Sequence, residues 1–164
     1  MTEQSPMVTV THPPQAMMRV VNPALRFLLR MPFAGAARKQ FMVLTVRGRK
    51  TGRQYVIPLS AHVIDNTLYA MTDAPWKYNF RNGATAEVLH DGQTTTMHGN
   101  LIEDHATAAD LFHRCAESYG VKRAQRMMGL TFREPRMPTL REFADAVDRE
   151  HLAAIKLTPS PAAT

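Results

Sequence analysis

The chain has 164 residues, of which 45% are hydrophobic and 21% charged, a composition typical of one globular domain with its own core. Its single cysteine, Cys115, excludes an internal disulfide and a cysteine metal cluster, and no apolar run approaches the roughly 18 residues that cross a bilayer. The net charge of +6 predicts anionic partners, but the cations are dispersed and zinc-finger spacing is absent, so a nucleic-acid partner is not expected.

The N-terminal region combines a polar tail with an amphipathic helix. Residues 1–18 are expected to be a flexible tail, since their first part is polar and rich in proline. This tail lacks the basic start and apolar core of a signal peptide, which predicts a cytoplasmic protein. Asn22-Pro23 predicts a helix start, and the leucines of residues 24–30 fall on one face. We expect this helix to pack on the β structure; because its other face is basic, peripheral contact with a membrane is the alternative.

The middle of the chain has the pattern of short strands joined by tight turns. Six strands are expected, at residues 40–46, 54–64, 67–72, 84–90, 94–103 and 151–157. Asp65-Asn66 and Asp91-Gly92 each predict a two-residue turn between neighbouring strands. Hairpins between neighbours favour an antiparallel sheet over a doubly wound one. The predicted fold is therefore mainly β with α, a six-stranded antiparallel barrel with N-terminal and C-terminal helices.

Three helices are expected before the last strand. Asp104 predicts the cap of a helix over 105–119, and a second helix is expected over 121–128. The sequence TLRE at 139–142 has the spacing of a capping box and predicts a third helix through Val147. The link before it, with two prolines, is expected to be irregular. Taken together, these elements predict a single domain over residues 19–158 and a C-terminal tail over 159–164.

The most informative segment is Leu44–Leu59, LTVRGRKTGRQYVIPL, where two apolar runs flank a turn with four cations and two glycines. Glycine permits positive φ angles and leaves backbone N–H groups uncovered, and cations beside such groups form a site for phosphate. An ordinary solvated basic turn is the alternative. Pro58 cannot donate to the ladder, so it is expected at an edge strand or at a bulge.

A second candidate segment is DAPWKYNFRNG at residues 73–83, which is expected to be a loop that opens a single helical crossover at 76–82. Trp76, Lys77, Tyr78 and Asn79 offer an aromatic plane, a cation, a hydroxyl and an amide within one turn. This set suits a planar heterocycle. The alternative is that the only tryptophan anchors the core while Lys77 lies in solvent.

Other catalytic chemistry has little support in the sequence. There is no nucleophile elbow, and Cys115 is expected to be a buried, unreactive thiol. The histidines lack the spacing of a metal site, so none is expected, although His90 and His98 flank a turn and could face each other across a hairpin.

The two candidate segments carry a family resemblance. Thr45 to Gly52, followed by Pro58-Leu59, matches the signature T-x-x-GRK[ST]G-x-x-x-x-x-PL, and APWKYNFRNG at 74–83 partly matches PxWYxNLxANP. Over residues 20–157 the chain resembles the deazaflavin-dependent nitroreductase family of actinobacteria such as mycobacteria. This family lies within the flavin/deazaflavin oxidoreductases of FMN-binding-like, split β-barrel fold, and the resemblance implies that fold.

The resemblance also implies a cofactor and a reaction. The cofactor would be coenzyme F420, a deazaflavin with a phosphate and an oligoglutamate tail; FMN is less favoured. The reaction would transfer a hydride from the reduced cofactor to an electron-poor small molecule such as a quinone, an enone or a nitro compound. The implied contacts are Arg49, Lys50, Thr51 and Gly52 with the anionic tail, Val56, Ile57 and Pro58 along the ring, and Trp76, Lys77 and Asn79 closing the site.

The sequence also offers candidates for proton delivery, for assembly and for a different function. Ser60 and Tyr78 are candidates for proton delivery. A homodimer is possible, because the barrel family commonly dimerises. The alternative function is a non-redox protein that binds a lipid, a fatty acid or another small molecule on the same barrel. The short loop before Trp76, with the anionic Asp73, favours that alternative.

Overall fold

The computed structural model describes residues 5–11 and 36–160, which form two compact units. The β unit comprises the described residues of 13–70, 74–101 and 155–164, and the helical unit those of 1–12, 71–73 and 102–154. The helix predicted at 24–30, with its membrane contact, lies outside the described residues. The single domain expected over 19–158 stays a prediction.

The β unit is built on one seven-stranded sheet. Its strands are β2 (Phe41–Arg47), β3 (Gln54–Ser60), β4 (His62–Ile64), β5 (Thr67–Thr72), β6 (Ala84–His90), β7 (Gln93–Ile102) and β9 (Ala153–Pro159), in the order β3-β2-β6-β7-β9-β5-β4. A short helix, α2 (Ala36–Gln40), leads directly into β2. The β2–β3, β2–β6, β4–β5 and β6–β7 pairs are antiparallel.

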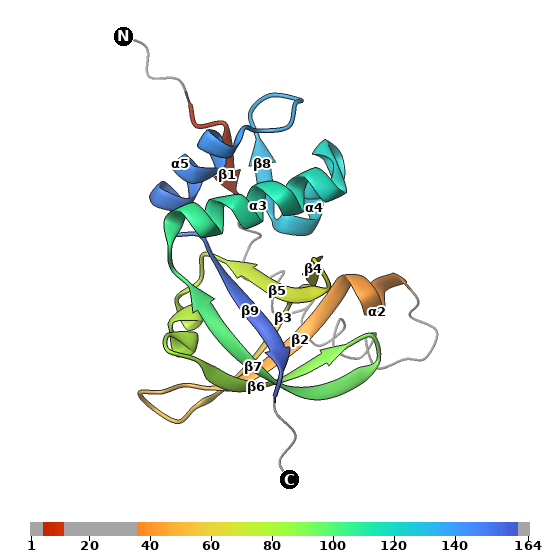
Figure 1. The fold of residues 1–164 in the computed structure, drawn as a ribbon, viewed down its shortest axis with the longest axis vertical. Coiled ribbons are helices and arrows are strands. Elements are labelled where there is room, and N and C mark those ends of the chain that lie inside the picture. Colours follow the sequence, from red (N-terminus) through yellow and green to blue (C-terminus); the bar gives the residue numbers. More distant parts are fainter. Residues whose placement is uncertain (1–4, 12–35, 161–164) are drawn as a thin grey trace. The chain divides into compact units, whose positions relative to one another are not determined.

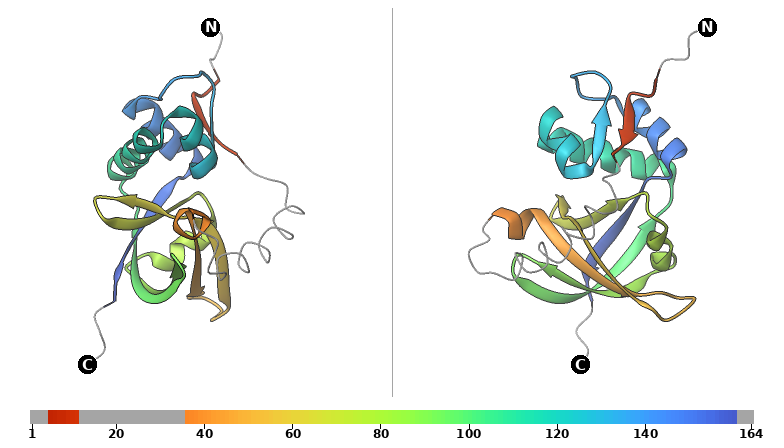
Figure 2. Two further views of the ribbon diagram at one scale, coloured as in Figure 1. Left: turned by 90° about the vertical axis from the view of Figure 1, so that its right-hand side faces the viewer. Right: turned by 180° about the vertical axis from the view of Figure 1, so that it is seen from behind.

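The sheet is a curled half-barrel rather than the predicted six-stranded barrel (Figures 1 and 2). The strand predicted over 54–64 is two strands, because the chain bends at Ala61, which is buried and donates its N–H to the Gln40 carbonyl at 2.8 Å. The first and last strands in the order, β3 and β4, are therefore separated by one residue. Because a single residue links the two edge strands, these strands must lie close together, and the sheet must curl to bring them there.

Tight turns set the register of this sheet. Asp65 and Asn66 have φ angles of 51° and 62°, and Asp91 and Gly92 have 51° and 78°, as a two-residue hairpin turn with two positive φ angles requires. Both predicted turns are confirmed. Met42, Leu44 and Val46 lie two residues apart along β2, and all three belong to the buried cluster of the β unit.

A 3-10 helix, η1 (Pro75–Phe80), replaces the helical crossover that was expected at 76–82. Phe80 is fully buried and lies against Gly99 in β7, where an added Cβ would come within 2.5 Å of the Phe80 ring. Trp76 packs edge-to-face on Phe80, with ring centroids 6.3 Å apart. The Phe80 ring thus fixes η1 to the sheet and places Trp76 at its surface.

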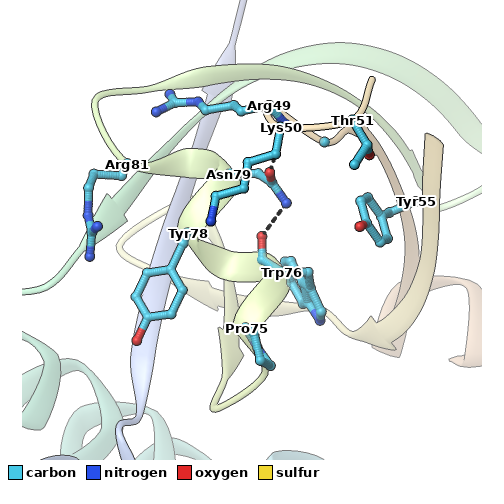
Figure 3. Close-up of a pocket in the computed structure, with 10 residues that line it drawn as sticks. Arg49, Lys50, Thr51, Tyr55, Pro75, Trp76, Tyr78, Asn79 and Arg81 are labelled. Carbon is cyan, nitrogen blue, oxygen red and sulfur yellow. Dashed lines mark hydrogen bonds between the residues drawn. The ribbon is translucent and has the colours of Figure 1, made fainter. Parts of the chain in front are cut away.

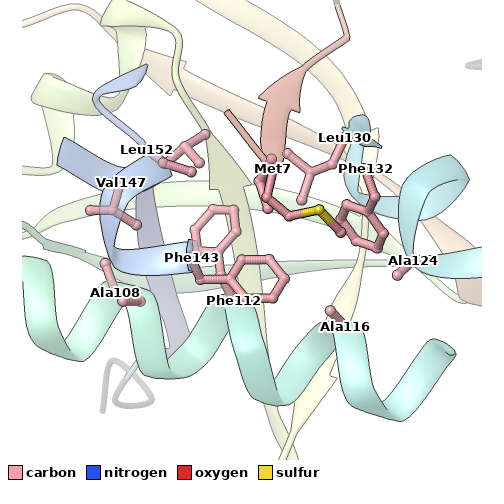
Figure 4. Packing of buried hydrophobic residues seen from close by; sticks show 13 residues of the cluster. Met7, Ala108, Phe112, Ala116, Ala124, Leu130, Phe132, Phe143, Val147 and Leu152 are labelled. Carbon is pink, nitrogen blue, oxygen red and sulfur yellow. The ribbon is translucent and has the colours of Figure 1, made fainter. Parts of the chain in front are cut away.

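The helical unit contains α3 (His105–Tyr119), α4 (Val121–Met128), α5 (Leu140–Glu150), β1 (Val8–Val10) and β8 (Leu130–Phe132). Asp104 caps α3 by accepting the Thr107 N–H at 3.0 Å, and Thr139 forms the predicted capping box with Glu142. Aromatic side chains from α3, α5 and β8 fill its core, with Phe132 packed edge-to-face on Phe143 (Figure 4).

Two short strands in the helical unit correct the sequence predictions. Val8–Val10 lies within the range expected to be a flexible tail, and Leu130–Phe132 within a link expected to be irregular. The two segments pair antiparallel as β1 and β8, with Val8 opposite Phe132. Each strand is only 3 residues long, too short for its alternation to stand out in the sequence, but Val8 and Phe132 are both buried in the core.

Candidate functional site

A hollow of about 740 Å³ lies in the β unit between the β2–β3 turn and η1 (Figure 3). Two parts of the chain supply its walls. The turn and the start of β3 contribute Gly48, Arg49, Lys50, Thr51 and Tyr55; η1 and the residue after it contribute Pro75, Trp76, Tyr78, Asn79 and Arg81. The two segments singled out from the sequence therefore come together at one place.

The amide groups of the turn are largely engaged within the protein. Gly48 N–H donates to the Arg53 carbonyl at 2.7 Å and Gly52 N–H to the Gly48 carbonyl at 2.9 Å. Arg53 N–H donates to Thr51 Oγ1 at 3.2 Å, and Arg49 N–H to Asn79 Oδ1 at 3.1 Å. At most the Lys50 and Thr51 amides remain for a ligand. The expected cradle of uncovered N–H groups is thus wrong for most of the turn, and an anion bound there would be held chiefly by side chains.

The cations around the hollow differ in what they contact. Arg49 Nη2 donates to the Gly83 carbonyl at 2.7 Å, and the Arg81 guanidinium lies 4.9 Å from the centre of the Tyr78 ring. The Lys50 side chain is exposed and extends toward η1 (Figure 3). No described residue forms a hydrogen bond or an ion pair with the Lys50 ammonium. Lys50 is therefore the cation best placed to meet an anionic ligand.

Trp76 combines the two roles that the sequence left as alternatives. One side of the residue packs against the buried cluster of the β unit, and the residue also lines the hollow. Tyr55 does the same from β3. Gly48 allows this placement of Tyr55, because a Cβ at position 48 would lie 2.8 Å from the Tyr55 ring. The hollow thus has an aromatic wall that is continuous with the core.

Five of the ten cofactor contacts implied by the resemblance line the hollow, namely Arg49, Lys50, Thr51, Trp76 and Asn79. The other five do not. Gly52 lies at the turn with a φ of 71°, as glycine there was expected to have. Lys77 does not line the hollow and is only 3% exposed, with its ammonium 5.0 Å from the centre of the Tyr78 ring. This burial contradicts the alternative that placed Lys77 in solvent.

The remaining three residues, Val56, Ile57 and Pro58, lie further along β3. Ile57 packs against the buried cluster, and its neighbours face the opposite side of the sheet because side chains alternate along a strand. Pro58 stands on the first strand of the sheet order, in an unbroken register opposite Val43, so it occupies an edge strand and not a bulge.

The proton-delivery candidates are also separated. Tyr78 lines the hollow and is 42% exposed, whereas Ser60, at the end of β3, is not among the lining residues. Sequence reasoning missed Tyr55, Pro75 and Arg81. The sequence does indicate Tyr55, because it lies two residues before Ile57 in β3 and so faces the same side of the sheet. No sequence pattern indicates Arg81.

Histidine and cysteine offer no second centre in the described ranges. His90 lies opposite Gln93 and His98 opposite Thr85, so the two histidines do not face each other as considered from the sequence. No group of three potential metal ligands occurs in the part of the chain that the structure describes. Burial raises the pKa of the Cys115 thiol to about 12, so this thiol is buried and un-ionised, as expected.

A second hollow of about 350 Å³ is lined by residues of β2, β3, β6 and β7. Its lining includes Thr45, Arg47, Gln54, Thr85 and Glu87. It contains a carboxylate and no aromatic ring, so it is a poorer match for a flat anionic ligand than the hollow beside Trp76.

Comparisons with known proteins do not assign a family. No protein-family model matches the chain, and no curated protein matches it. Among solved structures, it is similar to the conserved hypothetical protein Rv2991 from Mycobacterium tuberculosis, with a TM-score of 0.46 and 13% identity over 98% of this chain and 87% of the other. A second structure, described as a domain-swapped dimer, has a TM-score of 0.44 and 13% identity over 87% of this chain and 99% of the other. No helix among the described residues is long and apolar enough to span a membrane.

Proposed function

We propose that the chain is a deazaflavin (F420)-dependent reductase on a split β-barrel, which transfers a hydride to an electron-poor small molecule. The observation that carries the proposal is the lining of the hollow beside Trp76. Aromatic side chains form one wall, cations surround it, and none of the ten described residues that line it is acidic. This combination suits a flat ring with an anionic tail.

The lining fits such a cofactor in size and in chemistry. Sites for cofactors and drug-sized ligands commonly enclose about 300–1,000 Å³, and this hollow has about 740 Å³. Trp76 and Tyr55 offer the ring a surface that the core holds in place. Lys50 offers the phosphate a point charge, while Asp73, which the sequence suggested would oppose it, does not line the hollow.

Hydride transfer would be the chemistry of a reduced deazaflavin held in this hollow, so the protein would need no nucleophile of its own. Its residues would bind the ring, orient it and keep water from it. Tyr78 is the proton-delivery candidate that lines the hollow. The Lys77 ammonium and the Arg81 guanidinium, 5.0 Å and 4.9 Å from its ring centre, hold that ring in place.

A fluorescence titration with purified full-length protein tests the proposal. We expect quenching of F420 fluorescence at micromolar concentrations of protein. A protein that leaves F420 fluorescence unchanged, and instead binds a long-chain fatty acid, would be the non-redox carrier. A protein that purifies yellow with bound FMN would show that the cofactor assignment is wrong.

The charge of Lys50 gives a sharper prediction. Lys50→Ala should weaken F420 binding about tenfold, because hydrogen bonds between charged groups contribute roughly 1.5–3 kcal/mol and partial exposure reduces this. A deazaflavin ring without phosphate or glutamate should bind Lys50→Ala and wild type equally well. Equal losses for both ligands would contradict the role of Lys50 as the phosphate contact.

A further inference from the structure

We propose that Arg49 and Asn79 are positioning residues that tie the two walls of the hollow together, and that neither is a principal contact of the ligand. The inference rests on the proposed function for the identity of the ligand, but not for the contacts themselves. It replaces the roles that the family resemblance implied for both residues.

Three hydrogen bonds carry this inference, and Figure 3 draws the residues that form the two at Asn79. The Arg49 N–H donates to Asn79 Oδ1 at 3.1 Å, and Asn79 Nδ2 donates to the Trp76 carbonyl at 2.9 Å. The Arg49 guanidinium donates to the Gly83 carbonyl at 2.7 Å. The two bonds from Arg49 connect the β2–β3 turn to η1 and to the residues after it, across 30 to 34 positions of the chain.

The Asn79 amide is suited to this position because it accepts and donates at once. Its oxygen takes the N–H of the turn, while its nitrogen satisfies a carbonyl within η1. An aspartate could replace the acceptor but not the donor, and alanine could replace neither. The donor at position 49 is a backbone N–H, so a side-chain substitution at Arg49 leaves that bond intact.

The wall separation matters to any flat ligand that touches both walls. Trp76 and Tyr78 belong to η1, whereas Lys50 and Tyr55 belong to the turn and to β3. If the walls move apart, the ring loses its contacts with one of them, whatever charge the ligand carries. Loss of the Asn79 bonds should therefore weaken neutral and anionic ligands by the same factor, unlike loss of Lys50.

The test compares three full-length variants, Asn79→Ala, Asn79→Asp and the control Lys50→Ala, with two probes. The probes are F420 and the deazaflavin ring without its phosphate and glutamate tail. We expect Asn79→Ala to weaken both probes alike, by about tenfold. A variant that loses only F420 would make Asn79 a contact of the anionic tail and overturn the inference.

A second readout needs no ligand. Amide hydrogen exchange at Arg49 should be slow in wild type, remain slow in Asn79→Asp and become at least about tenfold faster in Asn79→Ala, because a carboxylate still accepts that N–H. Equal exchange in all three proteins would overturn the inference. If wild type binds neither probe, the proposed function fails, and the exchange rates still decide whether the two walls are tied.

Discussion

At the scale of single residues, Gly48 should be the least replaceable residue of the β2–β3 turn. A Cβ at this position would lie 2.8 Å from the Tyr55 ring and 3.4 Å from the Arg53 carbonyl oxygen. Gly48→Ala must push the ring out of place, and such overpacking lowers the free energy of unfolding by about 1–3 kcal/mol. Urea denaturation measures this loss. Because Tyr55 lines the hollow, the affinity for the ligand should fall together with the stability.

Gly52 provides the matched control within the same turn. It has a φ of 71° and open space around the position of a Cβ. Glycine is therefore favoured at this position by the backbone conformation and not by a lack of space for a side chain. Gly52→Asn should cost only a few tenths of a kcal/mol, since asparagine tolerates left-handed φ angles. A Gly48→Ala protein that is as stable as wild type would show that Tyr55 has another place to go.

Half of the cofactor contacts implied from the sequence line the hollow, but their hydrogen-bond partners could not be predicted from it. The turn motif placed Lys50, Arg49 and Thr51 at the hollow, and the tryptophan motif placed Trp76 and Asn79 there. Which donors face a ligand depends on contacts between segments about 30 positions apart, and a local pattern does not encode those contacts. The sequence motif therefore suggested that the Arg49 N–H faces the ligand, whereas in the structure this N–H donates to Asn79 Oδ1.

At the scale of elements, the start of α5 carries a strong local signal. Thr139 Oγ1 accepts the Glu142 N–H at 3.2 Å, and the Glu142 carboxylate accepts the Thr139 N–H at 2.9 Å. Arg136 donates to both oxygens of the same carboxylate, and these bonds lower the pKa of Glu142 to about 2. Thr139→Ala should lower the free energy of unfolding by about 1 kcal/mol, while Thr139→Ser should retain most of the stability that the cap contributes. Urea denaturation at neutral pH distinguishes the two variants.

Strand β4 should make the protein sensitive to acid through His62. This side chain is 2% exposed, and its burial lowers the pKa from 6.5 to about 4. Between these pH values the unfolded chain binds a proton that the folded protein does not. The free energy of unfolding should therefore be highest above pH 6.5 and fall by up to about 3 kcal/mol as the pH drops to 4.

The variant His62→Gln isolates this contribution. The difference in free energy of unfolding between wild type and variant, measured by urea denaturation from pH 4 to pH 8, should shrink or reverse toward acid, because glutamine does not titrate. A difference that stays constant over this range would mean that His62 titrates alike in the folded and unfolded protein.

Elements with a strong local signal were predicted well, and those held by distant partners were not. Helices α3 and α4 match their predicted ranges, because caps and glycines mark their ends. Strands β1 and β8 are each 3 residues long and acquire strand geometry only from each other, 120 or more positions away. The short helix α2 was missed for a related reason, since 5 residues carry too little periodicity to be recognised.

At the scale of the whole molecule, the chain passes repeatedly between its two units. The helical unit collects residues from three separate ranges, and strands β5, β7 and β9 each begin in one unit and end in the other. A prediction that divides the chain into contiguous domains cannot describe this arrangement. Sequence patterns show where an element lies, but they do not show which core it packs into. Each unit nevertheless has its own cluster of buried side chains.

These two clusters permit a last prediction, which concerns how far the units unfold independently. Phe143 and Leu44 are both fully buried, the first in the core of the helical unit and the second in that of the β unit. Phe143→Ala and Leu44→Ala should each lower the free energy of unfolding by about 2–5 kcal/mol through the cavity that each leaves. If the clusters are independent, the two losses should add to within about 0.5 kcal/mol in the double variant. Amide exchange should then accelerate chiefly in α3 and β8 for Phe143→Ala, and in β2 and β6 for Leu44→Ala. Equal acceleration in both sets of elements by either variant would instead show that the strands shared between the units make them unfold as one.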